Sequence, residues 1–280
     1  MKRVIAPNGT VYYRSELLSC PHGFSTRIGG VSTRPHTATM NLAFDRGDEP
    51  ETVLENLRRF AEGVGIEAAR IISVSQIHSA KVRYVTPEHA GEGFFREETC
   101  LCDGYVTDRR GIAPAVRTAD CVPILLYAPP TTDFSGAIAA LHAGWRGTAA
   151  GIGAVAVEQM KSLGARPETI RCAIGPSIGP CCYEVREDFV EAFSAMAGDS
   201  LCKRYVLPCE GRPGVYRADL RAVNQTILLR AGLRAEHMDI AEHCTACRPE
   251  EFFSHRYSGG VRGTMLSVIS LTDGNDEESR

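Results

Sequence analysis

Among the residues of types that bind transition metals or act as nucleophiles, three are candidates for a shared site: Cys121, His142 and His78. Each lies where a short apolar segment meets polar residues. Two imidazoles and one thiolate leave one position of a tetrahedral zinc ion open, as in a catalytic rather than a structural zinc site. The same thiol and imidazole could instead act as a cysteine nucleophile and its base. Residue type and spacing leave both chemistries open, because free cysteines are commonly inert buried residues.

Two apolar segments must position the thiol and the second imidazole. Val122–Tyr127 is short, continuous and apolar and ends at a Pro-Pro turn, so it predicts a strand buried on both faces. Gly136–Leu141 predicts a second such strand, which ends at His142. The glycine-containing segment 144–147 then leads into a predicted helix over 148–163. A strand, a glycine-rich turn and a helix in succession is where α/β folds place chemistry.

Composition limits the classes of function. With 280 residues, 44% of them hydrophobic and 23% charged, the chain can bury one large core. The net charge of -3 offers no basic surface for nucleic acid and no cationic face for a membrane, so we expect a small-molecule substrate. No apolar segment approaches a membrane span and the N-terminus lacks a signal segment, so we expect a cytoplasmic protein. We expect a monomer or a weak dimer.

The remaining segments predict short strands alternating with helices. Asn8-Gly9 between apolar alternations predicts an N-terminal hairpin. Asp48 and Pro50 predict the cap and first turn of a helix that ends near Val64. Further strands are expected over 104–107, 171–174 and 265–271, further helices over 184–197 and 219–231, and a surface loop over 82–102. We therefore expect a single α/β domain over 1–272, with mixed β-sheet layers covered by helices, and a disordered tail over 273–280.

A glycine-rich loop over residues 22–32 is a candidate anion site. Gly29 and Gly30 would let the backbone approach a ligand, and Arg27 offers a planar fork of donors. On residue types alone the loop is more typical of a turn with a surface arginine, since no Walker-type Lys-Ser/Thr follows. Arg146, near a predicted helix start, is another candidate cation.

Five motifs occur in a fixed order along nearly the whole chain: His22–Ser32, Gln76–His78, Arg117–Cys121, His142–Gly147 and Ile174–Val185. Together they resemble the laccase-domain family, once described as multicopper polyphenol oxidases and now regarded as zinc-dependent purine nucleoside enzymes. In that family the metal is bound by the histidine of Gln-x-His, the cysteine of Thr-Ala-Asp-Cys and the first histidine of His-Ala-Gly-Trp-Arg-Gly. The resemblance therefore implies zinc at His78, Cys121 and His142, with copper the less favoured metal.

The resemblance also implies an activity and a substrate site. It implies phosphorolysis of adenosine, inosine and S-methyl-5′-thioadenosine, hydrolytic deamination of adenosine to inosine, and a cysteine-hydrolase-like fold. Purine nucleoside and phosphate are thus the expected partners. The predicted substrate-binding residues are Arg27, Gly29, Gly30, Asn41, Gln76 and Arg146.

For several residues near the predicted metal ligands, the sequence allows both a functional and a structural role. Asp120 is a candidate general acid or base, although strand alternation can point its side chain away from the thiol ligand. Asp103 is a candidate site carboxylate, but an aspartate before glycine is more often a turn former. Trp145 suits purine stacking and core packing equally. Relatives often carry a histidine near Asp45 and Arg46, so no role is transferred to these two.

Three other functions stay open. A copper polyphenol oxidase needs a histidine-rich cluster, typically built from His-x-His pairs, and this chain has 8 histidines and no His-x-His. An amidase or hydrolase acting on a peptidoglycan precursor would use Cys121 as nucleophile and His142 as base. A zinc- or nucleotide-binding regulatory module would bind without turnover.

The 11 cysteines are expected to be thiols rather than a disulfide framework, because the chain shows no export signal. Cys244-x-x-Cys247 could form half of a structural zinc site or a redox pair. No second Cys-x-x-Cys follows and no thioredoxin-like pattern surrounds it, so neither interpretation is favoured.

Overall fold

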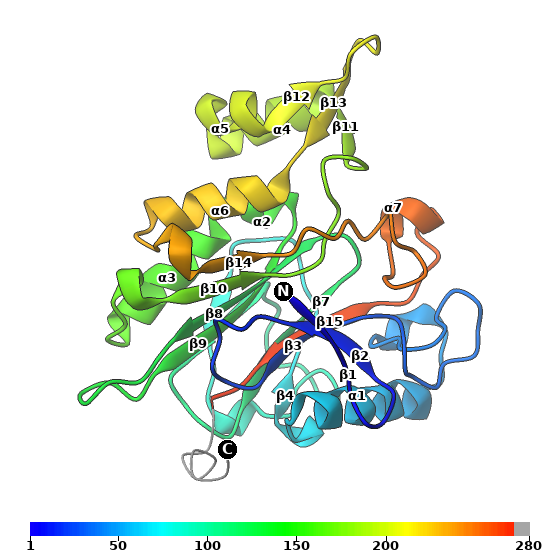
Figure 1. Cartoon of the computed structure of the whole chain (residues 1–280), viewed down its shortest axis with the longest axis vertical. Coiled ribbons are helices and arrows are strands. Elements are labelled where there is room, and N and C mark those ends of the chain that lie inside the picture. The colour runs from blue at the N-terminus through cyan, green and yellow to red at the C-terminus, as the bar shows by residue number, and fades with distance from the viewer. Residues whose placement is uncertain (272–280) are drawn as a thin grey trace.

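Two six-stranded sheets face each other at the centre of the structure (Figure 1). The computed structural model describes residues 1–271, so the tail predicted over 273–280 lies outside the described residues. The first sheet has the order β1 (Lys2–Ile5), β2 (Val11–Arg14), β3 (His22–Ser25), β15 (Met265–Ile269), β7 (Ala113–Thr118) and β4 (Ile71–Ile72). The second has the order β14 (Met238–Ile240), β10 (Arg171–Ile174), β8 (Val122–Ala128), β9 (Ala137–Ala143), β6 (Gly104–Thr107) and β5 (Val82–Tyr84). Both sheets mix parallel and antiparallel pairs, as predicted.

The layers follow from the alternation of side chains along the two central strands. Leu125 and Ile138 face the first sheet, whereas Ile124 and Leu126 face the helices on the other side of the second sheet. Because both faces of β8 and β9 are covered, both strands consist almost entirely of apolar residues. This continuous burial is why the two strands could be predicted from sequence.

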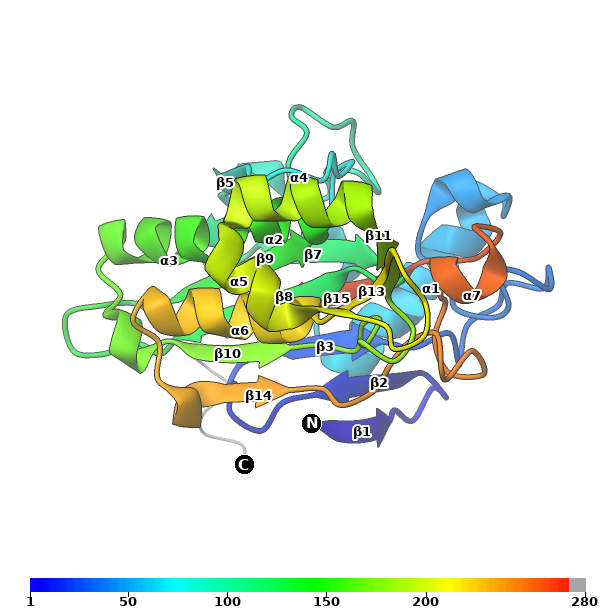
Figure 2. The ribbon, with the colours of Figure 1, turned by 90° about the horizontal axis from the view of Figure 1, so that it is seen from above.

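Seven α-helices complete the described part of the chain: α1 (Pro50–Val64), α2 (Trp145–Ala149), α3 (Ile152–Ser162), α4 (Glu187–Ala197), α5 (Asp199–Tyr205), α6 (Leu220–Arg230) and α7 (His255–Ser258). The first covers the outer face of the first sheet, and α3 and α6 cover the second (Figures 1 and 2). A small third sheet of β11 (Glu184–Arg186), β13 (Val215–Ala218) and β12 (Val206–Pro208) lies beside α4 and α5. Residues 1–271 contain no helix long and apolar enough to cross a bilayer.

Most predicted elements are present, and the exceptions have local causes. The helix expected over 148–163 is divided into α2 and α3 at Gly151, whose φ of 76° is left-handed. The helix expected from Glu184 begins three residues later, because 184–186 pair with β13. The predicted surface loop over 82–102 begins with β5. Asp48 does not cap α1; its carboxylate accepts hydrogen bonds from Ser32, Thr37 and Asn41.

Candidate metal centre and substrate cavity

The thiol and the two imidazoles predicted to bind metal converge on one point. Their ligand atoms all lie within 4.8 Å of one another. The ladder between β8 and β9 places Pro123 opposite His142, so Cys121, just before β8, lies at the same end of the sheet as His142. His78 comes from the loop after β4, and its ring meets the His142 ring edge-on at a centroid distance of 4.9 Å. The structure therefore brings together three residues from three separate segments.

Asp103, immediately before β6, orients both histidines. It is fully buried, and its Oδ1 accepts a hydrogen bond from His142 Nδ1 at 2.9 Å. Because a carboxylate only accepts, Nδ1 carries a proton, and Nε2 is the nitrogen that a metal could bind in the neutral imidazole. The same carboxylate accepts the backbone N–H groups of Ile77, His78 and Ser79 at 3.3, 2.9 and 2.8 Å. Asp103 is thus a structural part of the site, and its interpretation as a simple turn former is wrong.

The backbone of His78 takes an uncommon conformation. Its φ of 59° lies in the left-handed region, which costs a non-glycine residue free energy. The hydrogen bonds from consecutive N–H groups to Asp103 hold the loop in this shape. The backbone therefore fixes where the exposed His78 side chain leaves the loop.

The three polar side chains at the centre perturb one another strongly. Burial acts to raise the pKa of Cys121, but the charge and hydrogen bond of His142, helped by His78, lower it to about 6. Burial acts to lower the pKa of His142, but the Cys121 thiolate and the Asp103 carboxylate raise it to about 9. Hydrogen bonds from His142 and Ser79 overcome burial and lower the pKa of Asp103 to about 2. Without metal, the thiol and imidazole therefore form a thiolate–imidazolium pair near neutral pH.

Gly144 leaves room for this cluster. A Cβ atom at this position would lie 3.0 Å from His78 Cδ2, 3.4 Å from Cys121 Sγ and 3.5 Å from His142 Cε1. The glycine of the His-Ala-Gly-Trp-Arg-Gly segment is therefore in contact with all three candidate ligands. The donor set fits a metal ion held by one thiolate and two neutral imidazoles.

A cavity of about 410 Å³ opens over the cluster. Its lining includes the three candidate ligands and Gln76, whose amide is held by the backbone of Arg117 through bonds of 2.8 and 2.7 Å. Three arginines, two carboxylates and an aromatic ring also line it: Arg46, Arg117, Arg262, Asp45, Glu98 and Phe44. Except for Gln76, the residues predicted to bind substrate do not line this cavity.

The glycine-rich loop has a different environment from the one predicted. Arg27 directs its donors to backbone carbonyls, with Nε 2.8 Å from Ala38 O and Nη1 2.7 Å from Pro249 O. A Cβ at Gly29 would lie 2.3 Å from Gly9 O, and one at Gly30 would lie 2.2 Å from Thr39 O. These glycines allow close packing of backbone segments. The loop's predicted contact with phosphate stays a prediction that this geometry does not favour.

Asn41, Arg146 and Trp145, which the sequence also suggested for substrate binding, lie outside the cavity lining. Asn41 is buried and bonded to Asp48, at 2.9 Å, and to the backbone. Arg146 is exposed and stacks on Trp145, with its Cζ 4.2 Å from the ring centroid. Trp145 in turn packs against Phe189 at 5.2 Å, so the ring lies against the hydrophobic core rather than in the cavity.

Asp120 points away from the cavity. One carboxylate oxygen accepts from Thr245 Oγ1 at 2.6 Å and the other from the backbone N–H of Arg256 at 2.7 Å. Its backbone φ is 98°, a second left-handed conformation beside a candidate ligand. This carboxylate therefore anchors two distant segments and is not directed at a substrate.

Sequence reasoning missed three arginines that line the cavity. Arg46 Nε and Arg262 Nη1 both donate to Thr264 Oγ1, at 3.4 and 2.7 Å. Arg262 Nε is buried without a hydrogen-bond partner. Burial and the neighbouring Arg46 cation lower the pKa of Arg262. No local sequence signal marks this pair, because its members lie far apart in the chain and meet only through the fold.

The chain matches one family model and is similar in sequence to several named enzymes. A family model described as multi-copper polyphenol oxidoreductase laccase matches residues 21–272. A purine nucleoside phosphorylase of Deinococcus radiodurans is 38% identical over 274 residues, covering 97% of this chain and 98% of the relative. The purine nucleoside phosphorylase YlmD of Geobacillus stearothermophilus is 38% identical over 251 residues, 88% of each chain. The adenosine deaminase RL5 of an unknown prokaryotic organism is 34% identical over 251 residues, 88% of this chain and 92% of the relative.

Solved structures share the fold. A crystal structure of Bacillus licheniformis YfiH superposes with a TM-score of 0.86 at 30% identity, covering 96% of this chain and 99% of that one. The crystal structure of YlmD from Geobacillus stearothermophilus gives a TM-score of 0.83 at 36% identity, covering 94% of this chain and 96% of that one. The predicted single-domain α/β fold of laccase-domain type is confirmed.

Proposed function

The chain belongs to the multi-copper polyphenol oxidoreductase laccase family, and we propose that it is a zinc-dependent enzyme acting on purine nucleosides. The proposed reactions are phosphorolysis of adenosine, inosine and S-methyl-5′-thioadenosine, and hydrolytic deamination of adenosine. The observation that carries the proposal is the cluster of His78, Cys121 and His142 at a cavity that also contains arginines. Relatives described as purine nucleoside phosphorylases and an adenosine deaminase support it.

The donor set supports zinc and an open coordination position. Two imidazoles and one thiolate are a ligand set of catalytic zinc sites, where the fourth position receives water or substrate. Zinc there would supply a Lewis acid and make water a usable nucleophile near neutral pH. Asp103 holds the proton on His142 Nδ1, and the depressed pKa of Cys121 provides the thiolate. Zinc binding would release the second proton of the His142 imidazolium.

The arginine pair supports an anionic co-substrate. Arg46 and Arg262 converge on Thr264 Oγ1, and Arg262 Nε lacks a partner. Two nearby guanidinium groups repel each other, and a phosphate bound between them would relieve the repulsion and satisfy the free donor. We assign phosphate to this pair. In phosphorolysis a phosphate oxygen bonds to C1′ of the ribose while the bond from C1′ to the purine breaks, and the purine leaves with a proton.

The cavity suits a nucleoside in size and chemistry. Its volume of about 410 Å³ is within the range of small-molecule sites. Phe44 offers an aromatic face for a base. In deamination, water adds at C6 of adenosine and ammonia leaves, which requires a proton-transfer group. Asp45 and Glu98 are the lining carboxylates, and we assign proton transfer to this pair in place of Asp120.

The direct test is incubation of metal-analysed protein with adenosine, with and without phosphate, followed by chromatography. We expect inosine without phosphate, and adenine with ribose 1-phosphate when phosphate is present. A His78→Ala variant should lose both activities, because it removes one of three zinc ligands. Absence of either product from protein with a filled zinc site would contradict the proposal.

The phosphate assignment has its own matched pair of variants. Arg262→Met should raise KM for phosphate about 10- to 100-fold, the loss of a charge-assisted hydrogen bond, while deamination stays unchanged. Arg146→Met is the control, because this exposed arginine does not line the cavity. If Arg146→Met raises KM for phosphate and Arg262→Met does not, the sequence-based assignment of phosphate to Arg146 is favoured instead.

One observation favours a second candidate function. The lowered pKa of Cys121 beside His142 is the property of a cysteine nucleophile with its acid-base partner. In an amidase the thiolate would attack the amide carbon, and His142 would give its proton to the departing amine. Such activity on a peptidoglycan precursor would survive chelation and be lost on alkylation, whereas the zinc reactions should disappear on chelation.

Copper oxidation is less supported. Within residues 1–271 the groups of three or more potential metal ligands are a two-histidine, one-cysteine cluster and a four-cysteine cluster. Neither provides the histidine-rich cluster of a multicopper oxidase. Oxidation of a phenol by the copper-loaded protein, absent from a His142→Ala variant, would favour that function.

A further inference from the structure

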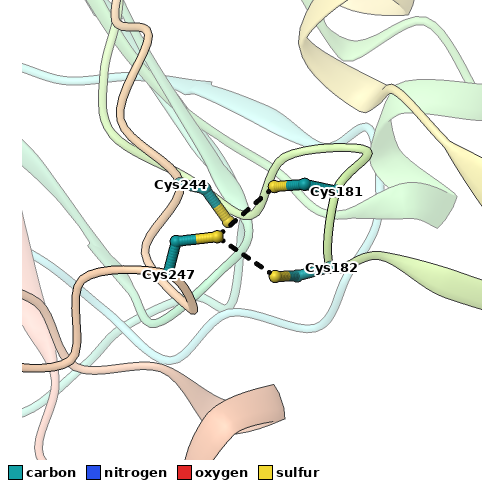
Figure 3. Close-up of side chains that lie close together, drawn as sticks. All are labelled: Cys181, Cys182, Cys244 and Cys247. Carbon is teal, nitrogen blue, oxygen red and sulfur yellow. Dashed lines mark hydrogen bonds between the residues drawn. The ribbon is translucent and has the colours of Figure 1, made fainter.

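Four cysteines from two distant loops meet at a second site (Figure 3). Cys181 and Cys182 lie between β10 and β11, and Cys244 and Cys247 follow β14. Their sulfur atoms all lie within 4.8 Å of one another. Cys247 Sγ is 3.3 Å from Cys182 Sγ and 3.5 Å from Cys181 Sγ. This cluster shares no residue with the metal centre above.

The backbone holds the two loops together independently of the thiols. Ser177 and Cys244 form a parallel β-bridge, and Thr245 N donates to Ser177 O at 3.1 Å. Gly179 N donates to Cys244 Sγ at 3.2 Å. Backbone N–H groups of this kind stabilise a thiolate bound to a metal. The loops are therefore aligned so that their sulfur atoms face a common centre.

We infer that Cys181, Cys182, Cys244 and Cys247 bind a structural zinc ion. A tetrahedral centre with Zn–S bonds of about 2.3 Å places its sulfurs about 3.8 Å apart, close to the separations here. Four thiolates leave no open position, which is the form of a structural rather than a catalytic zinc site. The donor set differs from the Cys-His-His set of the catalytic cluster, so the two sites can be told apart.

Neither core packing nor disulfide bonding accounts for the grouping of these four thiols. Cys244 and Cys182 pack in a small apolar cluster with Ile178 and Ala246. Cys181 and Cys247 are exposed, so burial does not explain why all four thiols meet. All four are free thiols, and their sulfur separations exceed a disulfide bond of about 2.05 Å. Exposed thiols without a metal are open to oxidation, which coordination would prevent.

The zinc would connect to the catalytic cluster through one short path. Thr245, between Cys244 and Cys247, donates to the Asp120 carboxylate at 2.6 Å. Ile178 N, in the other loop, donates to Asp120 O at 2.9 Å. Asp120 precedes Cys121, so the ion would fix the segment that carries the catalytic thiolate. We expect its loss to reduce stability and, secondarily, activity.

Zinc stoichiometry after purification under reducing conditions tests the inference. We expect about two zinc ions per chain in the natural sequence, and about one in each of Cys247→Ser, Cys181→Ser and His78→Ala. Cys247→Ser combined with His78→Ala should hold none. Cys209→Ser is the matched control, because this cysteine belongs to neither cluster, and it should keep two.

A second measurement avoids dependence on the folding of cysteine variants. The His78→Ala protein should retain zinc whose X-ray absorption spectrum shows only sulfur neighbours. Its cobalt form should show the intense charge-transfer absorption of several thiolates. Retention of no metal, retention of iron instead of zinc, or nitrogen neighbours in the spectrum would overturn the inference. Because His78 is absent from this protein, the result does not depend on the proposed function.

Discussion

Replacing Asp103 by asparagine tests how the metal centre is organised. The substitution keeps the size of the side chain but exchanges one acceptor oxygen for an NH2 group. Four nitrogen groups donate hydrogen bonds to the Asp103 carboxylate: the backbone N–H groups of Ile77, His78 and Ser79, and His142 Nδ1. In either amide orientation, the NH2 group therefore faces at least one donor that it cannot satisfy.

Each orientation predicts a defined loss. If the NH2 group replaces Oδ1, the imidazole of His142 must turn Nδ1 into an acceptor and carry its proton on Nε2, which blocks metal binding. The His78 N–H loses its acceptor in the same orientation, so the left-handed backbone at His78 loses support. If the NH2 group replaces Oδ2, the part-buried N–H groups of Ile77 and Ser79 lose their acceptor at about 1–3 kcal/mol each. We expect zinc affinity to fall about 10- to 100-fold and the free energy of unfolding to fall by about 2 kcal/mol.

The assay is competition for zinc with a chromophoric chelator, together with thermal melting of the metal-free protein. Asp133→Asn is the control, because this aspartate is exposed and lies outside the cavity. An Asp103→Asn protein that binds zinc within about threefold of the natural sequence would show that the carboxylate does not orient the ligands, and would refute the reasoning.

Three further predictions follow from the same geometry. Gly144→Ala should weaken zinc binding without unfolding the protein, because its methyl group would press on His78 and Cys121. Unchanged zinc affinity would show that these side chains can move to accommodate the methyl group. In metal-free protein, the rate of Cys121 alkylation should rise as pH increases through about 6 and level off above, since the depressed pKa gives a thiolate at neutral pH. In His142→Ala the midpoint of this rise should move toward 9. A midpoint near 9 in the natural sequence would contradict the ion pair. Asp120→Asn should keep kcat within about threefold and lower the Tm by about 2–4 °C, whereas loss of turnover at unchanged Tm would make Asp120 the proton-transfer group.

The central strands and the positions of the residues at their ends were predictable because they depend on local signals. Continuous burial of β8 and β9 gives uninterrupted apolar segments, and the residues at their ends are polar by contrast. The antiparallel ladder that brings Cys121 beside His142 is a consequence of the short connection between the strands. Gly151 shows the limit of local patterns, because apolar periodicity continues across it although its backbone ends one helix and begins another.

The partners of the site could not be predicted because they meet only in the folded chain. Asp103 precedes a glycine, and this local context is typical of a turn; only the fold brings it to His142. Arg46 and Arg262 are separated by most of the sequence. The four-cysteine cluster joins a Cys-Cys pair to Cys244-x-x-Cys247, so a search for a second Cys-x-x-Cys motif does not find it.

The two candidate metal clusters differ in what holds their side chains. In the cluster of His78, Cys121 and His142, Asp103 bonds the His142 ring and the His78 backbone, and Cys121 directly precedes a central strand, so the protein positions the donors before metal arrives. In the four-cysteine cluster, three thiols are partly or fully exposed on two loops that backbone hydrogen bonds align, and the proposed zinc would cross-link these loops. Gradual chelation should therefore separate the two proposed sites. Removal of metal from the cluster of His78, Cys121 and His142 should abolish turnover with little change in melting temperature, whereas removal of metal from the four-cysteine cluster should lower that temperature. If chelation lowered activity and melting temperature together at every chelator concentration, the two clusters would have to be organised as one unit.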